Sequence, residues 1–246
     1  MGKNFSLCMG ALFCLAVTPP GAAQGLEKDT IKTPEGDLVI TFVAHGTLVL
    51  SYAGKIIHVD PWTELADYTK LPKADLILVT HDHFDHLDLK AIELIRTGQT
   101  SIVTDEATAK QVKGAIVLKN GETREVQGIR IEAVPAYNLV QMSAPGKPFH
   151  PKGVGNGYIV TLGGKRIYIG GDTENTPEVK ALKNIDIAFL PMNLPYTMTP
   201  EMVADAVKAF RPKVLYPYHQ GDTDLSKLVA LLKSEKDIEL RLRKMP

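Results

Sequence analysis

The chain has 246 residues, of which 44% are hydrophobic and 23% are charged, and its 28 basic residues balance its 28 acidic residues. This is the composition of an ordinary globular protein of one or two domains. The lack of a basic excess argues against a nucleic-acid-binding surface, and a formal charge of zero gives no long-range attraction for charged substrates.

The first two dozen residues predict a secretory signal peptide. Lys3 precedes an apolar stretch at 5–17, and small residues follow as far as Ala23. A basic start, a short apolar segment and small residues before the cleavage site are typical of such peptides, and the stretch is short for a membrane span. We expect a signal peptide at 1–23, one domain at 24–246, and a secreted or periplasmic mature chain without a stable membrane span. An uncleaved N-terminal anchor is the alternative.

Both cysteines, Cys8 and Cys14, lie within this leader. The mature chain then has no thiolate to serve as a nucleophile or a metal ligand. Any bound metal must be held by His, Asp, Glu or neutral oxygen and amide groups.

Short apolar runs bounded by turn residues predict many strands and a few helices. The predicted strands are 37–42, 47–52, 55–59, 75–80, 101–104, 115–118, 122–126, 128–134, 157–162, 166–169, 185–190, 214–218 and 238–242. The predicted helices are 87–95, 106–113, 200–210 and one that begins at Asp224 and ends near 234. A strand-rich first half and a mixed second half indicate a mixed α/β fold, and two mixed sheets packed face to face with helices outside would bury these apolar faces.

Six consecutive residues, from His81 to His86, carry most of the functional information. The sequence His-Asp-His-Phe-Asp-His directly follows the apolar strand predicted at 75–80, so several good metal ligands crowd one loop. His81 and His83 are two residues apart and lean to the same side of an extended segment. Asp85 and His86 are adjacent and point to different places. One ion could take the first pair, and a neighbouring ion the second.

This H-x-H-x-D-H pattern after a strand resembles the metallo-β-lactamase superfamily of binuclear metallohydrolases. The resemblance covers about residues 37–218, and the motif order looks most like the branch that includes L-ascorbate-6-phosphate lactonase and N-acyl-phosphatidylethanolamine phospholipase D. The other matching motifs are His45-Gly46-Thr47, Asp60-Pro61-Trp62 and Gly171-Asp172-Thr173. The resemblance implies a four-layer αβ/βα sandwich of two mixed β-sheets flanked by helices, with the metal site at the sheet edge.

The resemblance also implies roles for single residues. Asp172 matches the carboxylate that bridges both metals, and His219 matches the last ligand. Asp60 matches the acidic residue that supports ligand imidazoles from behind, and we expect His45 beside the site without ligating. From the residues alone, Asp172 is also compatible with a turn aspartate and His219 with a half-buried histidine.

One position departs from the family pattern. Asn138 stands where the family usually has a histidine, and an amide is a poorer zinc ligand than imidazole. We expect His150, twelve residues later, to fold back from the loop at 138–156 and complete the first site. The alternatives are a substrate-binding His150, a site with a single metal, or an exposed loop residue.

Loops as long as 138–156 often cover binding sites. We expect this one to form a pocket wall together with five aromatic residues: Trp62, Tyr68, Tyr137, Phe149 and Tyr196.

The expected function is a metal-dependent hydrolase with two divalent ions, Zn²⁺ in the first instance and Mn²⁺ or Fe²⁺ as alternatives. One ion is expected on His81, His83 and His150, the other on Asp85, His86 and His219, with Asp172 bridging. The ions lower the pKa of a shared water, which attacks a small ester, lactone or phosphodiester as a metal-bound hydroxide. Asp85 is the expected catalytic group, orienting the nucleophile and passing a proton to the leaving group. The competing readings are an iron-dependent redox protein of the same fold and a non-catalytic metal-binding protein.

Overall fold

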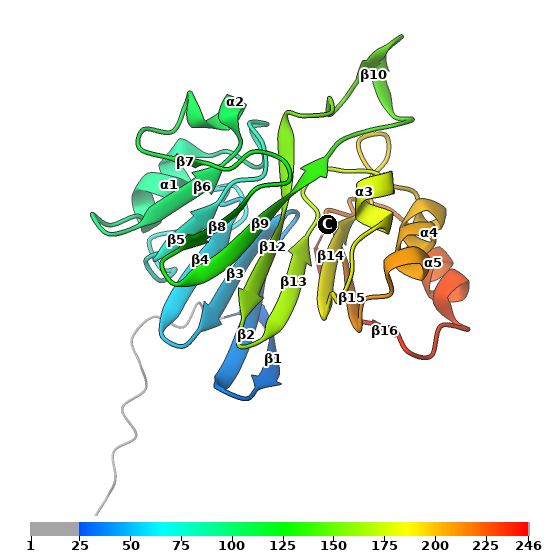
Figure 1. Cartoon of the computed structure of the whole chain (residues 1–246), viewed down its shortest axis with the longest axis horizontal. Coiled ribbons are helices and arrows are strands. Elements are labelled where there is room, and N and C mark those ends of the chain that lie inside the picture. The colour runs from blue at the N-terminus through cyan, green and yellow to red at the C-terminus, as the bar shows by residue number, and fades with distance from the viewer. Residues whose placement is uncertain (1–24, 246) are drawn as a thin grey trace, which may run out of the picture.

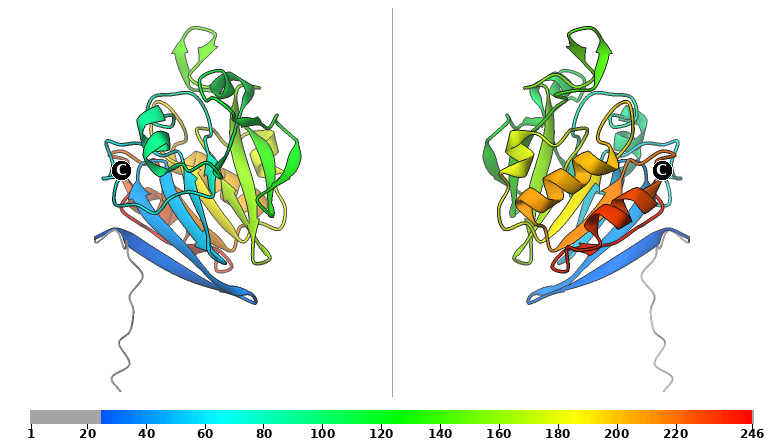
Figure 2. Two further views of the ribbon diagram at one scale, coloured as in Figure 1. Left: turned by 90° about the vertical axis from the view of Figure 1, so that its left-hand side faces the viewer. Right: turned by 90° about the vertical axis from the view of Figure 1, so that its right-hand side faces the viewer.

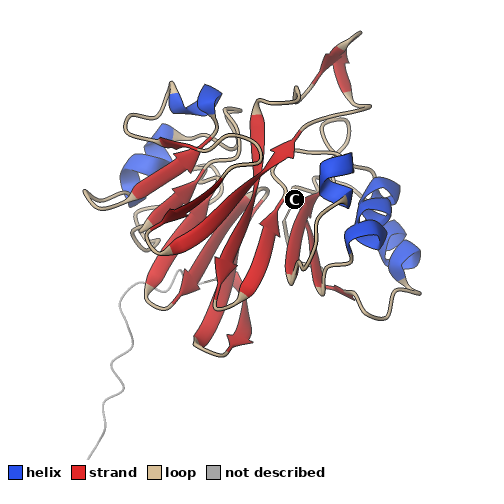
Figure 3. Ribbon diagram, in the orientation of Figure 1, coloured by secondary structure: helices blue, strands red, loops and turns tan. Residues whose placement is uncertain are grey.

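The computed structural model describes residues 25–245, in which the strands form two seven-stranded sheets and a separate two-stranded hairpin. The two large sheets face each other, and helices cover both outer sides (Figure 1, Figure 3). This is the four-layer α/β sandwich expected from the sequence. The signal peptide predicted at 1–23 lies outside the described residues.

The first sheet has the strand order β1-β2-β3-β4-β5-β6-β7, in which the first four strands are antiparallel neighbours and the last three are added in parallel. Its strands are β1 (Glu27–Thr33), β2 (Gly36–Ala44), β3 (Thr47–Tyr52), β4 (Lys55–Val59), β5 (Leu76–Leu78), β6 (Ser101–Thr104) and β7 (Ile116–Val117).

The second sheet repeats this plan, with antiparallel strands on one side and parallel strands on the other. In sheet order its strands are β16 (Glu239–Leu240), β15 (Val214–Tyr218), β14 (Ile187–Pro191), β13 (Lys165–Ile169), β12 (Gly155–Leu162), β9 (Ile129–Ala136) and β8 (Thr123–Val126). Both sheets are therefore mixed.

The helices are short and are capped by side chains that accept their free N–H groups. They are α1 (Leu89–Ile95), α2 (Glu106–Ala109), α3 (Pro177–Lys180), α4 (Pro200–Phe210) and α5 (Leu225–Leu232). Asp88 caps α1, and Thr199 caps α4 ahead of a proline at its first position. Figure 2 shows α4 and α5 side by side on the outer face of the second sheet. Among the described residues, we find no helix of the length and apolarity that a membrane crossing requires.

Strand periodicity explains why both faces of each sheet are buried. In β14, Ile187 and Phe189 enter the core between the sheets, whereas Ala188 and Leu190 pack under the helices of the second sheet. β5 follows the same rule, because its alternate residues divide between the central core and the cluster under α1. This alternation buries one face of each sheet in the central core and the other face under helices, which produces the four layers. The strand ends lie outside these layers and lead into polar loops.

Most predicted elements agree with the structure, and β3, β4, β6, β15 and α4 match to the residue. The differences lie where long-range contacts decide the conformation. β1 was not predicted, because its sequence lacks an apolar period; it is held by pairing with β2 and by Asp29, which accepts hydrogen bonds from Arg243. The segment predicted as one loop contains a hairpin, β10 (Met142–Ala144) and β11 (Lys147–Pro148), and α3 was not predicted.

Candidate metal centre

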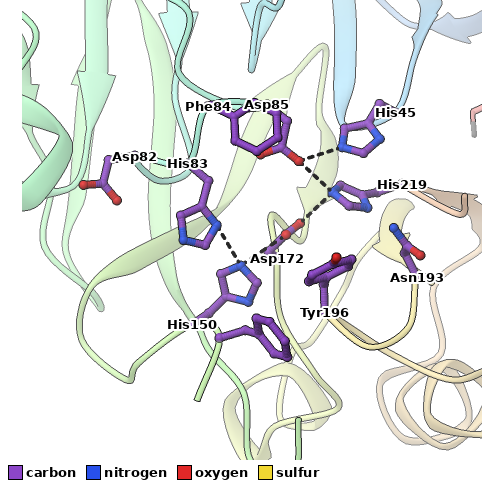
Figure 4. Close-up of a pocket in the computed structure, with 11 residues that line it drawn as sticks. His45, Asp82, His83, Phe84, Asp85, His150, Asp172, Asn193, Tyr196 and His219 are labelled. Atoms are coloured by element: carbon purple, nitrogen blue, oxygen red, sulfur yellow. Dashed lines mark hydrogen bonds and ion pairs between the residues drawn. The ribbon is translucent and has the colours of Figure 1, made fainter. Parts of the chain in front are cut away.

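Loops that follow strands of both sheets meet at one edge of the sandwich. β5 leads to His81, β13 to Asp172, β15 to His219 and β4 to Asp60. The carboxyl ends of parallel strands are the usual place for a site in α/β sheets. Figure 4 shows five of the side chains that meet there, His83, Asp85, His150, Asp172 and His219, turned toward one another. The structure brings together residues as far apart in the sequence as His45 and His219.

Three imidazoles form the first group. Donor atoms of His81, His83 and His150 lie within 4.8 Å of one another, and His150 Nε2 is 3.2 Å from His83 Nδ1. His81 and His150 are buried, whereas His83 is exposed. The group therefore opens toward solvent on the side of His83. The interpretation of His150 as an exposed loop residue is wrong.

A second group contains His45, Asp85, His86 and His219, whose donor atoms lie within the same 4.8 Å limit. His219 Nε2 is 3.7 Å, and His86 Nε2 3.9 Å, from Asp85 Oδ2. His45 Nε2 is 3.0 Å from that oxygen. His45 thus lies beside the site as expected, and the structure adds that its partner is Asp85.

Asp172 stands between the two groups and turns one oxygen to each. Its Oδ1 is 3.5 Å from Nε2 of both His86 and His219. Its Oδ2 is 3.2 Å from His150 Nε2 and 3.9 Å from His81 Nε2. A carboxylate in this position can offer a ligand atom to each of two ions at once.

Hydrogen bonds behind the cluster select the tautomers of two imidazoles. The Nδ1–H of His86 donates to Asp60 Oδ2 at 2.8 Å. Thr80 Oγ1 donates to the same oxygen at 2.7 Å, so Thr80 must accept from His81 Nδ1, which is 3.0 Å away. Both rings therefore donate through Nδ1 and turn Nε2 to the centre, where that atom can bind a cation once it carries no proton. Asp60 has the supporting position that the sequence predicted.

Asn138 lies behind His150, as a partner of its imidazole. Its Oδ1 accepts the backbone N–H of His150 at 2.7 Å and lies 2.7 Å from His150 Nδ1, so this ring also turns Nε2 to the centre. Its Nδ2 donates to Glu174 Oε1 at 3.0 Å and to Tyr196 O at 2.9 Å. The Glu174 carboxylate, fully buried, also accepts the backbone N–H groups of residues 139–141. Asn138 and Glu174 thereby fix the loop that carries His150.

Neighbouring charges decide the protonation of the buried groups. Burial lowers the pKa of His86, but the carboxylates of Asp172 and Asp60 outweigh it and raise that pKa to about 9. Burial opposes ionisation of Asp172, but His219 and His86 hold its pKa well below the usual value. Burial and the neighbouring His86 lower the pKa of His81. Asp172 is therefore ionised at neutral pH, and a cation bound at the centre would displace the proton of His86.

The backbone around the cluster adopts conformations that non-glycine residues seldom take. His45, Asp60 and His219 have φ values of 52°, 43° and 46°. Such residues persist only where the surrounding structure holds them, and they gather at functional sites. Gly46 is required for close packing, because a Cβ there would lie 2.9 Å from His86 Cε1.

A cavity of about 510 Å³ opens above the cluster. Its walls include Phe84, Phe149, Asn193 and Tyr196 in addition to the His and Asp side chains (Figure 4). Phe149 and Tyr196 pack edge to face with their centroids 5.1 Å apart. This volume lies within the usual range for small-molecule sites.

The predicted aromatic wall is correct for Phe149 and Tyr196 and wrong for the other three residues. Tyr68 is buried, and its hydroxyl accepts the N–H of Trp62 at 2.8 Å. Tyr137 is buried and donates to Glu178 at 2.8 Å. Trp62 itself packs against the rings of two neighbours and does not line the cavity.

Sequence reasoning missed four residues that shape the site. Phe84 lies inside the histidine motif. A large apolar residue among metal ligands at a strand end could have indicated that its side chain forms part of the cavity wall. Thr80 closes the strand before the motif, where a hydroxyl can cap a ligand ring. Asn193 and Glu174 carry no local signal, because their roles depend on segments distant in the sequence.

The donor set fits transition-metal binding. Several inward-facing atoms are buried without a hydrogen-bond partner among residues 25–245, including Nε2 of His81, His86 and His219 and Oδ1 of Asp172. Unpaired buried polar atoms are costly. Tetrahedral zinc with ligand distances of about 2.0–2.1 Å places its donor atoms about 3.4 Å apart, and the inward-facing carboxylate oxygens here lie 3.2 to 3.9 Å from Nε2 of His81, His86, His150 and His219. Imidazole and carboxylate ligands suit zinc, iron and manganese.

Comparison with known proteins agrees with this geometry. The sequence profile of the Beta-lactamase superfamily domain matches residues 39–219. A UPF0173 metal-dependent hydrolase from Methanopyrus kandleri is 31% identical over 196 residues, which cover 74% of this chain and 84% of the relative.

Solved structures show the same architecture. A crystal structure described as a metal-dependent hydrolase from Parabacteroides distasonis has a TM-score of 0.86 and 49% identity, covering 90% of this chain and 100% of the other. A metallo hydrolase from Ignicoccus hospitalis has a TM-score of 0.70 at 24% identity, covering 84% and 95%, and this likeness concerns the fold.

Fold, site and sequence together define the class as a metal-dependent hydrolase of the metallo-β-lactamase fold. The chain belongs to the β-lactamase superfamily and, within it, to the UPF0173 metal-dependent hydrolases.

Proposed function

We propose that this chain binds two divalent ions, zinc in the first instance, and hydrolyses a small ester, lactone or phosphodiester. One ion is proposed on His81, His83 and His150 and the other on Asp85, His86 and His219, with Asp172 between them. The observation that carries this proposal is that Asp172 turns one oxygen to each of two histidine groups. When bound, the ions would polarise the substrate oxygen and lower the pKa of a water.

Asp85 is the residue proposed to handle protons. It lies in the pocket wall and is partly exposed, so it can reach both a bound substrate and solvent. Burial opposes its ionisation, but its contacts with His219 and His45 hold its pKa below the usual range. Asp85 is therefore a carboxylate at neutral pH, which can accept a hydrogen bond from the attacking water and pass a proton to the leaving group.

The remaining residues bind and orient. Asp60, Thr80 and Asn138 hold the tautomers of the inward-facing imidazoles, and such supporting contacts keep ligands in place for a metal. His83 and Asp85 lie on the open side of the cluster, where a substrate can approach from the cavity.

The first experiment is metal analysis of the purified mature protein together with ester, lactone and phosphodiester panels. Two ions per chain and turnover that depends on them would support the proposal. One ion per chain contradicts the two-ion site, and inertness of the metal-loaded protein toward all three panels contradicts hydrolysis. Zinc, manganese and iron are distinguished directly, so the same measurement also tests the iron-dependent redox alternative.

Two substitutions assign the roles. His150→Ala should lower the metal content per chain, whereas Asn138→Ala should lower affinity and leave the saturating stoichiometry unchanged. Asp85→Asn should reduce kcat by about 100-fold or more while the protein stays folded, and Asp67→Asn, an exposed carboxylate away from the pocket, serves as control. Near-normal turnover of Asp85→Asn would contradict the proton-handling role.

We also propose that the mature chain acts outside the cytoplasm, on the basis of the leader predicted at 1–23. N-terminal sequencing of the exported protein tests the expected cleavage after Ala23, and a cytosolic full-length product contradicts it.

A further inference from the structure

No lysine or arginine is among the described residues that line the cavity above the cluster of proposed ligands. Its acidic members are Asp82, Asp85 and Asp172, and Asp82 is exposed. Sites that recognise phosphates usually supply arginine, lysine or the N-terminus of a helix. Apart from its histidines and the ions proposed on them, the cavity therefore offers no cationic side chain to balance a phosphate.

The lysine closest in sequence to the proposed ligand His150 is already engaged. Lys152 follows it by two residues, but its Nζ lies 2.6 Å from Glu178 Oε1 and also contacts the Tyr137 hydroxyl. Its ammonium is therefore directed to Glu178 and does not line the cavity.

Part of the cavity wall is exposed apolar surface. Ten large hydrophobic side chains are exposed in the part of the chain that the structure describes. Phe84 and Tyr196 are two of them and line the cavity, and a third, Val154, lines the smaller adjoining pocket that also contains His83 and His150. Exposed apolar side chains in the wall of a cavity are typical of small-molecule sites.

Phe84 and the exposed segment after Asn138 are tied to the cluster. Phe84 lies between two proposed ligands and is 76% exposed. The segment with Leu139 and Val140 directly follows Asn138 and is held by Glu174. The polar groups on the far wall, Asn193 and Tyr196, are neutral hydrogen-bonding groups (Figure 4). The cavity thus combines an apolar entrance with neutral polar groups.

We propose that the substrate is an uncharged carboxylic ester or lactone with an apolar acyl chain or ring. This inference rests on the proposed hydrolase function and narrows its substrate class. The acyl chain would lie on Phe84, Phe149 and Tyr196, and the amide of Asn193 or the hydroxyl of Tyr196 would hold the polar end. In the reaction, water forms a bond from its oxygen to the acyl carbon, and the bond from that carbon to the alcohol oxygen breaks. The alcohol oxygen takes one proton from the water, and the new carboxylic acid loses another to solvent.

The test compares the metal-loaded protein on p-nitrophenyl acetate, butyrate and octanoate with bis(p-nitrophenyl) phosphate. Burial of one CH₂ is worth about 0.8 kcal/mol, or about fourfold, so kcat/KM should rise with acyl length by up to about fourfold per methylene until the chain leaves the cavity. Alkyl lactones of increasing length should show the same trend.

The outcomes separate this inference from the function on which it rests. Hydrolysis of the phosphodiester in preference to every ester and lactone overturns the inference and leaves the hydrolase proposal standing. Ester hydrolysis that does not change with acyl length also overturns it. Inertness toward all substrates contradicts the hydrolase proposal and removes the inference with it.

Phe84→Ala assigns the length dependence to the mouth of the cavity. Phe84 is so exposed that its loss should not unfold the protein, and it should raise KM for the octanoate at least fivefold while the acetate changes less than twofold. Val229→Ala removes exposed apolar surface on α5, away from the cavity, and should change neither substrate. An equal effect of Phe84→Ala on both esters would overturn the assigned contact.

Discussion

Asn138→Ala is the sharpest test of how this chain builds its site without a histidine at position 138. The substitution removes an amide that is 5% exposed and that supports His150 on one side and binds Glu174 and Tyr196 on the other. Without Oδ1, the His150 ring can rotate or exchange its tautomer. The expected result is a less stable fold and a weaker metal site with all proposed ligands still present.

The size of the expected loss of stability follows from the hydrogen bonds of the Asn138 side chain. Four hydrogen bonds end at this amide. A neutral hydrogen bond contributes about 1 kcal/mol net and one to a charged group about 1.5–3 kcal/mol, so three neutral bonds and the bond to Glu174 predict that the free energy of unfolding falls by about 5 kcal/mol. Loss of the partner that orients a ligand costs about 10–100-fold in metal affinity.

Two measurements check this. Urea unfolding of the chelated protein gives the stability change, and competition with a chromogenic chelator gives the metal affinity. Asn120→Ala is the control, because its amide donates to Gly155 O at 3.0 Å and Asn156 Oδ1 at 2.7 Å without touching a proposed ligand. It should lower stability by about 2 kcal/mol and leave affinity unchanged. If Asn138→Ala binds metal within twofold of the unsubstituted chain, Asn138 does not position His150.

Three further outcomes are expected. Gly46→Ala should lower metal affinity at least tenfold, because the added Cβ would lie 2.9 Å from His86 Cε1. Gly98→Ala is the control: its Cβ would meet no atom within 4 Å, so it should leave metal affinity unchanged. Equal affinities of the two variants in a chelator competition would contradict the role of Gly46. Burial raises the pKa of Asp29, but the hydrogen bonds and charges of Arg243, Tyr216 and Arg241 have the larger effect. They hold the Asp29 pKa below the ordinary 3.8. This carboxylate stabilises the fold above pH 3.8 and loses its contribution as the pH falls through the lower folded-state pKa. Asp29→Asn should therefore cost about 2 kcal/mol at pH 7, and its deficit in urea unfolding should shrink toward pH 3; a deficit independent of pH refutes the argument. Chelation should lower the thermal midpoint, since ligand at 100 times its Kd stabilises the native state by about 2.7 kcal/mol; an unchanged midpoint in calorimetry would mean that no tightly bound ion is present.

The first strand and the loop at 138–156 show where prediction from sequence stops. Glu27–Thr33 has no apolar alternation, and its position depends on Asp29 meeting Arg243, which is 214 residues away. The loop contains a hairpin and carries His150, but its course is set by the buried carboxylate of Glu174. Neither contact can be predicted from the local sequence, because each joins residues that are far apart in the chain.

The sequence by itself determined what acts over a few residues. Alternation of apolar side chains, turn residues and caps fixed β3, β4, β15 and α4, and the crowded His81–His86 motif placed metal chemistry at the end of a strand. Tertiary structure decided between the alternatives that remained for His150, set the distances at which Asp172 stands between the two groups, and decided which aromatic rings line the cavity. The physical reason is the distance along the chain over which each effect acts. Backbone propensity and capping act within one or two turns, whereas the positions of metal-donor atoms from distant segments depend on how both sheets pack on their common core.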